Sequence, residues 1–129
     1  MQILKTKWFT RFARKEDISD TKLAEAIQEI EKGLHDGDLG GNLLKKRVAR
    51  VGGGKSGGYR TIIVYRTKKR AVFVYGFPKN AKANLSAVEL DGYQKMAQIL
   101  LSISDAGIRK ALNAGELEEV KYHEKEISE

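Results

Sequence analysis

The residues that could do chemistry in this chain are lysines and arginines gathered between Asp38 and Glu89. No aspartate or glutamate stands between these two acids. Twelve basic residues do: Lys45, Lys46, Arg47, Arg50, Lys55, Arg60, Arg66, Lys68, Lys69, Arg70, Lys79 and Lys82. A solvated protein face normally mixes both signs, so a long stretch of one sign indicates a surface that meets phosphate groups.

A glycine-rich segment, GGGKSGG (52–58), interrupts the basic stretch. It does not fit a nucleotide-binding P-loop, because position 49 is alanine where the pattern needs glycine and because the next residues are strand-like. Glycines around Lys55 still let backbone amides approach an oxyanion. The alternative is a hairpin loop whose lysine only keeps it soluble. Arg60 and the basic strand before the loop favour phosphate binding.

Other catalytic groups are scarce. The acidic residues stand towards the two ends of the chain, so no carboxylate pair suggests itself. His35 and His123 have no metal-ligand spacing and are expected to be solvated surface residues. There is no cysteine. We therefore expect neither a metal nor another cofactor, and any chemistry falls to lysine and arginine, with tyrosine as a further candidate.

RNA is a substrate on which such groups suffice. The ribose 2′-hydroxyl can attack its own phosphodiester, so the protein needs only to align it, stabilise the charged phosphate and move protons. Arginine offers a bidentate fork for phosphate oxygens, and a lysine among like charges has a lowered pKa and can transfer a proton. The alternative is a polyanion-binding protein without chemistry.

The whole chain fits a single small domain. Its 129 residues are 41% hydrophobic and 32% charged, which is ordinary for a globular protein. Apolar runs are too short for a membrane span, no signal peptide is visible, and the lack of cysteine fits a reducing cytoplasm. Residues 1–80 carry 18 basic and 8 acidic groups (+10), whereas 81–129 carry 6 and 9 (−3). We expect a cytoplasmic protein with a polyanion as its main ligand.

The first third of the chain predicts a strand and a helix. Residues 3–13 are β-prone and are expected to form a strand that contributes core aromatics: Trp8, Phe9 and Phe12. The helix follows Ser19 as N-cap, with a staple between Ile18 and Leu23 and a stop at Gly33. Its apolar face comprises Leu23, Ala26, Ile27, Ile30 and Leu34. Residues 35–41 read as a turn.

Three strands are predicted in the middle, over 43–51, 59–66 and 71–77, the last two joined by a tight link. Alternation places one set of side chains on one face: Arg60, Ile62, Val64 and Arg66. The other face receives Tyr59, Thr61, Ile63 and Tyr65. We interpret the charges around the link as hairpin and edge-strand solubility: Arg66, Lys68, Lys69 and Arg70.

The chain returns to helix after Pro78. Ser86 and Glu89 form a capping box, and an apolar stripe follows: Leu90, Tyr93, Met96, Ala97 and Leu100. A short helix over 105–114 ends at Gly115. The predicted order is β-α-β-β-β-α-α, an α+β fold with a small, mostly antiparallel sheet. We expect one domain over 1–129 with a polar C-terminal extension from about 104.

Two strings carry a resemblance to a known family: LGGNLLKKRVARVGGGKSGGYRTIIVYR (39–66) and FVYGFPKNAKANLS (73–86). They resemble the RelE-like toxins of type II toxin–antitoxin systems, within the RelE/ParE superfamily and closest to its phage-derived, HigB-like group. The resemblance covers about 3–102, and GKSGGYR is its most specific part. It implies a sheet packed on an N-terminal helical segment and a basic concave surface that cleaves mRNA in the ribosome, without a metal. It also implies a cognate antitoxin, commonly a helix-turn-helix protein.

The resemblance further implies roles for named residues. Arg60 would stabilise the transition state, and Lys55 and Lys79 would clamp phosphate or transfer protons. Family members that use histidine differ from this chain, which has none in its basic stretch. Other members use a C-terminal tyrosine, and here Tyr75 lies near the end of the last predicted strand and Tyr122 in the tail. The residues expected to position RNA are Lys45, Lys46, Arg47, Arg50, Tyr59 and Lys82. The alternatives are a non-catalytic nucleic-acid-binding module, such as a decayed toxin, and a protein-interaction partner, which leaves the acid-free stretch unexplained.

Overall fold

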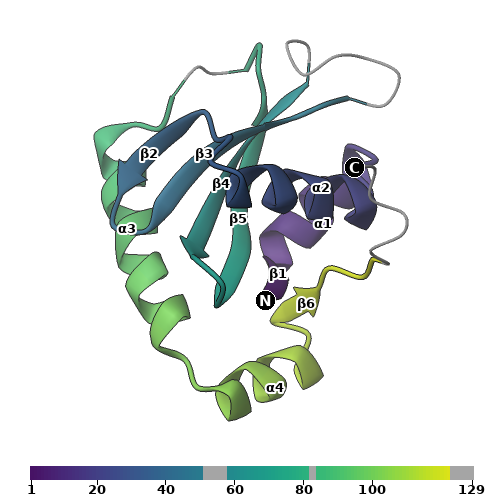
Figure 1. Cartoon of the computed structure of the whole chain (residues 1–129), viewed down its shortest axis with the longest axis vertical. Coiled ribbons are helices and arrows are strands. Elements are labelled where there is room, and N and C mark those ends of the chain that lie inside the picture. Colours follow the sequence, from purple (N-terminus) through teal and green to yellow (C-terminus); the bar gives the residue numbers. More distant parts are fainter. Residues whose placement is uncertain (51–57, 82–83, 123–129) are drawn as a thin grey trace.

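The computed structural model describes residues 1–50, 58–81 and 84–122, which form six strands and four helices (Figure 1). In chain order these are β1 (Gln2–Thr6), α1 (Lys7–Lys15), α2 (Asp20–Glu31), β2 (Gly37–Gly40), β3 (Leu43–Val48), β4 (Tyr59–Arg66), β5 (Arg70–Pro78), α3 (Ala87–Ser102), α4 (Asp105–Asn113) and β6 (Leu117–Glu119). The α+β class is as predicted. Within the described residues, no helix is both long and apolar enough to cross a membrane.

The strands form one sheet in the order β2-β3-β4-β5-β1-β6. Only the β1–β5 pair among them is parallel, so the prediction of a mostly antiparallel sheet is confirmed. β4 and β5 lie in the interior of the sheet, and β1 lies between β5 and the C-terminal strand β6. The first strand of the chain is therefore also an interior strand.

Helices cover both faces of the sheet (Figure 1). Ile63 of β4 packs with the buried side chains of α1 and α2, whereas Ile62 and Val64 pack with those of α3 and α4. The predicted alternation along β4 is confirmed by these two clusters. We call the two surfaces the α2 face and the α3 face. The candidate site below lies on the α3 face.

The predicted strand over 3–13 was wrong in its second half. The strand ends at Thr6, whose Oγ1 accepts a hydrogen bond from the backbone N of Phe9 at 3.2 Å and caps α1. Aromatic residues suggested a strand, but Phe9 and Ala13 are spaced for one helix face and both are buried. Trp8 lies off that face and is 44% exposed.

The two long helices begin as predicted. Ser19 caps α2 by accepting a hydrogen bond from Lys22 N at 3.2 Å, and Gly33 follows the helix with φ of +85°. Leu34 lies beyond the helix end and is exposed, so its assignment to the apolar face was wrong. Both hydrogen bonds of the Ser86–Glu89 capping box are present, and the predicted apolar stripe of α3 packs on the sheet.

Two short strands were missed. β2 lies in the segment predicted as a turn and reaches β3 through Gly41 and Asn42, both with positive φ. Two such residues make the turn that favours a tight hairpin. β6 lies in the segment predicted as a polar extension and pairs with β1. Neither strand has the length or alternating apolar pattern that identifies a strand in a sequence.

Candidate nucleic-acid interface

The cationic side chains of β3 and β4 meet at one end of the α3 face. In the strand register Arg47 lies opposite Arg60, and Arg60 lies opposite Phe77 of β5. Cross-strand partners project from the same face of a sheet, so the two arginines are neighbours there. Lys45, two residues before Arg47, belongs to the same face. Three basic residues from two strands thus share one surface.

Lys79 reaches the same corner from the end of β5. Its backbone N donates a hydrogen bond to Gly58 O at 3.3 Å, and Gly58 stands two residues before Arg60. A Cβ at Gly58 would lie 2.1 Å from Val48 O, so only glycine lets β3 and β4 approach here. We call Lys45, Arg47, Arg60 and Lys79 the basic corner. The predicted site residues Lys55 and Lys82 lie outside the described residues.

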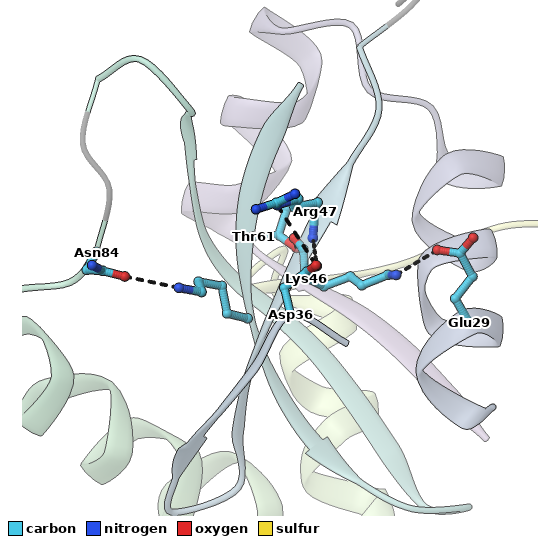
Figure 2. Close-up of polar contacts among 7 residues, drawn as sticks. Glu29, Asp36, Lys46, Arg47, Thr61 and Asn84 are labelled. Carbon is cyan, nitrogen blue, oxygen red and sulfur yellow. Dashed lines mark hydrogen bonds and ion pairs between the residues drawn. The ribbon is translucent and has the colours of Figure 1, made fainter. Parts of the chain in front are cut away.

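Hydrogen bonds and an ion pair position two members of the basic corner (Figure 2). The backbone N of Arg47 donates a hydrogen bond to Asp36 Oδ2 at 2.6 Å, and the side-chain Nε of Arg47 lies 3.9 Å from Asp36 Oδ1. Lys45 Nζ donates to Asn84 Oδ1 at 3.0 Å, which ties β3 to the segment that leads into α3. Both side chains remain partly accessible. They are therefore oriented but still able to meet a ligand.

Lys46 does not join the basic corner. Its Nζ lies 2.7 Å from Glu29 Oε1 of α2, and the lysine is 4% exposed. Figure 2 shows the Lys46 side chain directed to α2 and Asn84 on the opposite side of the strand. Alternation along β3 already separates position 46 from 45 and 47. That signal could have removed Lys46 from the predicted RNA-binding residues.

Tyr59 is also on the α2 face and is buried. Its hydroxyl donates to Glu16 Oε1 at 3.0 Å, and Arg50 Cζ lies 5.3 Å from the centre of its ring. Burial, together with the hydrogen bond and charge of Glu16, raises the pKa of Tyr59, while Arg50 acts in the opposite direction. The phenol stays protonated near neutrality and anchors α1 to the sheet. Arg50 is exposed beside it.

An aromatic cluster borders the basic corner, and Tyr75 is the one member of it that the sequence suggested for the site. Tyr75 has ring-centre distances of 4.9 Å to Trp8, 5.4 Å to Tyr93 and 5.7 Å to Phe77. Phe77 in turn lies opposite Arg60. Alternation could not orient Tyr75, because the β4–β5 register shifts between Ile62 and Ile63.

Tyr93 of the aromatic cluster remains protonated over the physiological range. Burial raises its pKa to about 12, and the nearby Tyr75 and Glu89 act in the same direction. A phenol with such a pKa can donate a hydrogen bond but does not serve as a base near neutrality.

The corner can bind phosphate oxygens through guanidinium and ammonium groups. Within the described ranges, no three histidine, cysteine, aspartate or glutamate residues gather as a metal site would require. His35 is exposed, and His123 lies outside the described residues.

The fold and the basic corner define a small α+β protein with a phosphate-compatible surface. The family model "RelE toxin of RelE / RelB toxin-antitoxin system" matches residues 1–120. The chain belongs to this family and is a toxin of a toxin–antitoxin system, so its partner is an antitoxin. The match reaches past the predicted 3–102 and includes β6. No curated protein matches the chain significantly.

Proposed function

We propose that this toxin is a ribosome-dependent mRNA endonuclease that acts without a metal. Family membership supports the toxin role. The observation that supports nuclease activity is the basic corner. There Arg60 lies opposite Arg47 and two residues after Gly58, whose backbone O accepts the hydrogen bond from Lys79 N. Such a cluster of cations fits the charge that develops on a phosphodiester under attack.

In the proposed reaction, the ribose 2′-oxygen forms a bond to its adjacent phosphorus and the bond from phosphorus to the 5′-oxygen breaks. The 2′-hydroxyl loses a proton and the departing 5′-oxygen gains one. The products are a 2′,3′-cyclic phosphate and a 5′-hydroxyl end. Arg60 stabilises the pentacovalent phosphate by its guanidinium fork. Lys79 and Lys55 clamp the phosphate or transfer the protons.

The remaining basic residues position RNA. Lys45 and Arg47 contact backbone phosphates at the corner, and Arg50 and Lys82 extend the surface by charge. We leave Lys46 and Tyr59 out of this role, because each is buried and bound to a glutamate on the α2 face.

This set of groups supports dependence on the ribosome. Lysine and arginine side chains are ordinarily protonated near neutrality and so are poor general bases, and most of the acceleration would come from holding the 2′-oxygen in line with the leaving group. Free single-stranded RNA is flexible and seldom adopts that geometry. mRNA held in the ribosome is already constrained, and the toxin then supplies electrostatic stabilisation.

The test is induced expression in a bacterium, with growth recorded and the 5′ ends of cellular mRNA mapped. Wild type should arrest growth and produce new 5′-hydroxyl ends inside translated frames. Arg60→Ala should reduce cleavage by about 100- to 1,000-fold, as expected when one transition-state donor is removed. Arg11→Ala removes an exposed arginine of α1 and should leave both effects unchanged.

Purified proteins separate this proposal from a non-catalytic binding module. Arg60→Ala should lose far more cleavage of ribosome-bound mRNA than RNA affinity. Equal small losses of both, or normal growth and uncut mRNA with folded wild type, would leave the binding module as the better account.

A further inference from the structure

A second basic site lies at the opposite end of β4. On the α3 face this strand presents Arg60, then Ile62 and Val64, then Arg66. The two apolar residues are fully buried and belong to the same core cluster as Ala97 and Leu100 of α3. The two arginines are about 20 Å apart at ~3.3 Å per residue. The helix thus covers the apolar middle of the strand and leaves a basic surface at each end.

At this second end of β4 the protein has a pocket of about 590 Å³. It lies where the β4–β5 turn approaches the start of α4, and Figure 1 shows α4 below this end of the sheet. Its charged lining residues are Arg66, Lys68, Lys69, Arg70, Asp105 and Arg109. Five cationic side chains therefore face a single carboxylate.

Arg70 is fixed in the wall of the pocket and is 8% exposed. Its Nη1 donates to Leu100 O at 2.7 Å and Ile103 O at 2.9 Å, and its Nε donates to Gln2 Oε1 at 3.0 Å. These neutral acceptors bind the hydrogens of Nη1 and Nε without cancelling the charge of the guanidinium. Asp105 lies 3.6 Å from Nη2 but is itself largely exposed, so water screens this pair. The pocket therefore keeps a fixed positive charge.

Edge protection does not explain the charges of this turn. β4 and β5 are interior strands, so the turn guards no free sheet edge. Lys68 also adopts φ of +60°, a conformation that glycine or asparagine adopts with less strain. A lysine at this position therefore carries a cost in backbone strain. A ligand that needs its charge would account for that cost.

We propose that this pocket binds phosphate groups of an RNA backbone and is a second anchoring site, remote from the basic corner. The inference rests on the proposed function in that its ligand is RNA. The exposed Arg66 and Arg109 offer guanidinium forks, which bind phosphate and carboxylate oxygens alike, so the choice of RNA over an acidic peptide rests on the position of the pocket. The pocket and the basic corner also share one strand and one face, so a single RNA can contact both.

The test compares two double variants that each lower the formal net charge from +7 to +5. Lys68→Gly with Lys69→Gln removes two pocket cations and relieves the left-handed backbone at 68. Arg11→Gln with Lys15→Gln removes two exposed cations of α1, remote from the pocket. Thermal unfolding of both variants checks that the fold is retained, and Arg109→Gln gives a further pocket variant on a different element.

The probe is a 2′-O-methyl RNA that is long enough to reach from one end of β4 to the other. Because its 2′-oxygens are methylated, this RNA cannot be cleaved by attack of its own 2′-oxygen. Its Kd is measured over a series of salt concentrations. Loss of two phosphate contacts should weaken binding by about tenfold and reduce the slope of log K against log salt by about 1.4 units. The α1 variant should change the slope far less. Because the probe measures binding alone, this result is independent of whether the toxin cleaves mRNA.

Equal slopes for the pocket and α1 variants would overturn the proposal. So would an unchanged RNA slope together with weaker binding of poly-glutamate, because the pocket would then serve an acidic protein segment. A reduced RNA slope without any detectable cleavage in cells would retain the second anchoring site and count against the nuclease.

Discussion

Lys46 and Glu29 join β3 to α2 through one ion pair, in the middle of a strand whose neighbouring cations face the other way. The Lys46 ammonium group is buried, so leaving it without the Glu29 carboxylate would be costly. The Glu29 carboxylate is only partly covered, and water can solvate it. Lys45 and Arg47 have no comparable burial. Of these three consecutive basic residues, Lys46 thus stabilises the fold, whereas Lys45 and Arg47 are open to a ligand.

We expect Lys46→Ala to lower the free energy of unfolding by about 1–3 kcal/mol, because a buried ion pair and the packing of its lysine stem are lost. Its affinity for the uncleavable RNA should match wild type. Arg47→Ala should show the reverse, weaker RNA binding with little loss of stability. Urea denaturation and the RNA titration measure the two quantities on the same protein preparations.

A Lys46→Met variant serves as the control for packing, since it retains an apolar side chain of similar length. Its stability should lie between those of wild type and Lys46→Ala. A loss of RNA affinity in Lys46→Met equal to that in Arg47→Ala would contradict the separation of the two faces.

At the scale of elements, α1 is held on β5 by a close approach at Gly76. A Cβ on Gly76 would lie 2.5 Å from Phe12 Cε2, well inside van der Waals contact. Phe12 also contacts Trp8 and the buried Tyr59. The ring therefore cannot withdraw without disturbing the aromatic cluster.

Gly76→Ala should destabilise the protein by about 1–3 kcal/mol, the usual cost of overpacking a core. The matched change Gly92→Ala lies within α3, where a Cβ would have no neighbour within 4 Å. It should stabilise by about 0.5–1 kcal/mol, because alanine favours a helix over glycine. Thermal unfolding of the two variants gives the comparison, and stabilisation by both would refute the close packing of α1 on β5.

The elements that the sequence predicted well are those whose signals are local. β4 has the predicted bounds, and α3 has both its capping box and its apolar stripe, because alternation and capping depend on adjacent residues. The boundary between β1 and α1 was missed, since aromatic content outweighed helical spacing. β2 and β6 depend on partners elsewhere in the sheet, which a single sequence does not reveal.

The site was predictable to a similar extent. The cation-rich stretch and the alternation along β4 identified the face of Arg60. The exclusion of Tyr59 was implicit in the same alternation, which put it on the opposite face. The orientation of Tyr75 required the register shift between β4 and β5, and the pocket around Arg70 required knowledge that the hairpin is interior. The register shift and the interior position of the hairpin depend on how the strands pair in the folded sheet, and no local sequence pattern reveals them.

At the scale of the whole molecule, the C-terminal strand completes the sheet. β6 pairs with β1, and the segment after it places Val120 in the core beside α2. Asp20 ties these parts together, accepting Lys5 Nζ and Lys121 N at 2.8 Å each. The C-terminal segment is therefore part of the domain body up to at least this contact.

A variant that ends after Gly115 should lose about 3 kcal/mol or more of stability, because two buried side chains, Leu117 and Val120, are removed at ~1.5–2 kcal/mol each. The control variant ends after Tyr122 and retains every described contact of β6. Denaturation of the two proteins tests this. Equal stability would show that β6 contributes nothing to the fold.

The position of β1 also has a consequence for the order in which the chain assembles. Gln2 pairs with Arg70 and Leu4 with Glu119, so both partners of β1 lie far downstream of it in the sequence. The β2–β3 and β4–β5 hairpins join neighbouring segments and can form early, whereas β1 must close long loops. A nascent chain would thus carry its central hairpin before its N-terminal strand is secured. The sheet is thus complete only once β6 is available to pair with β1.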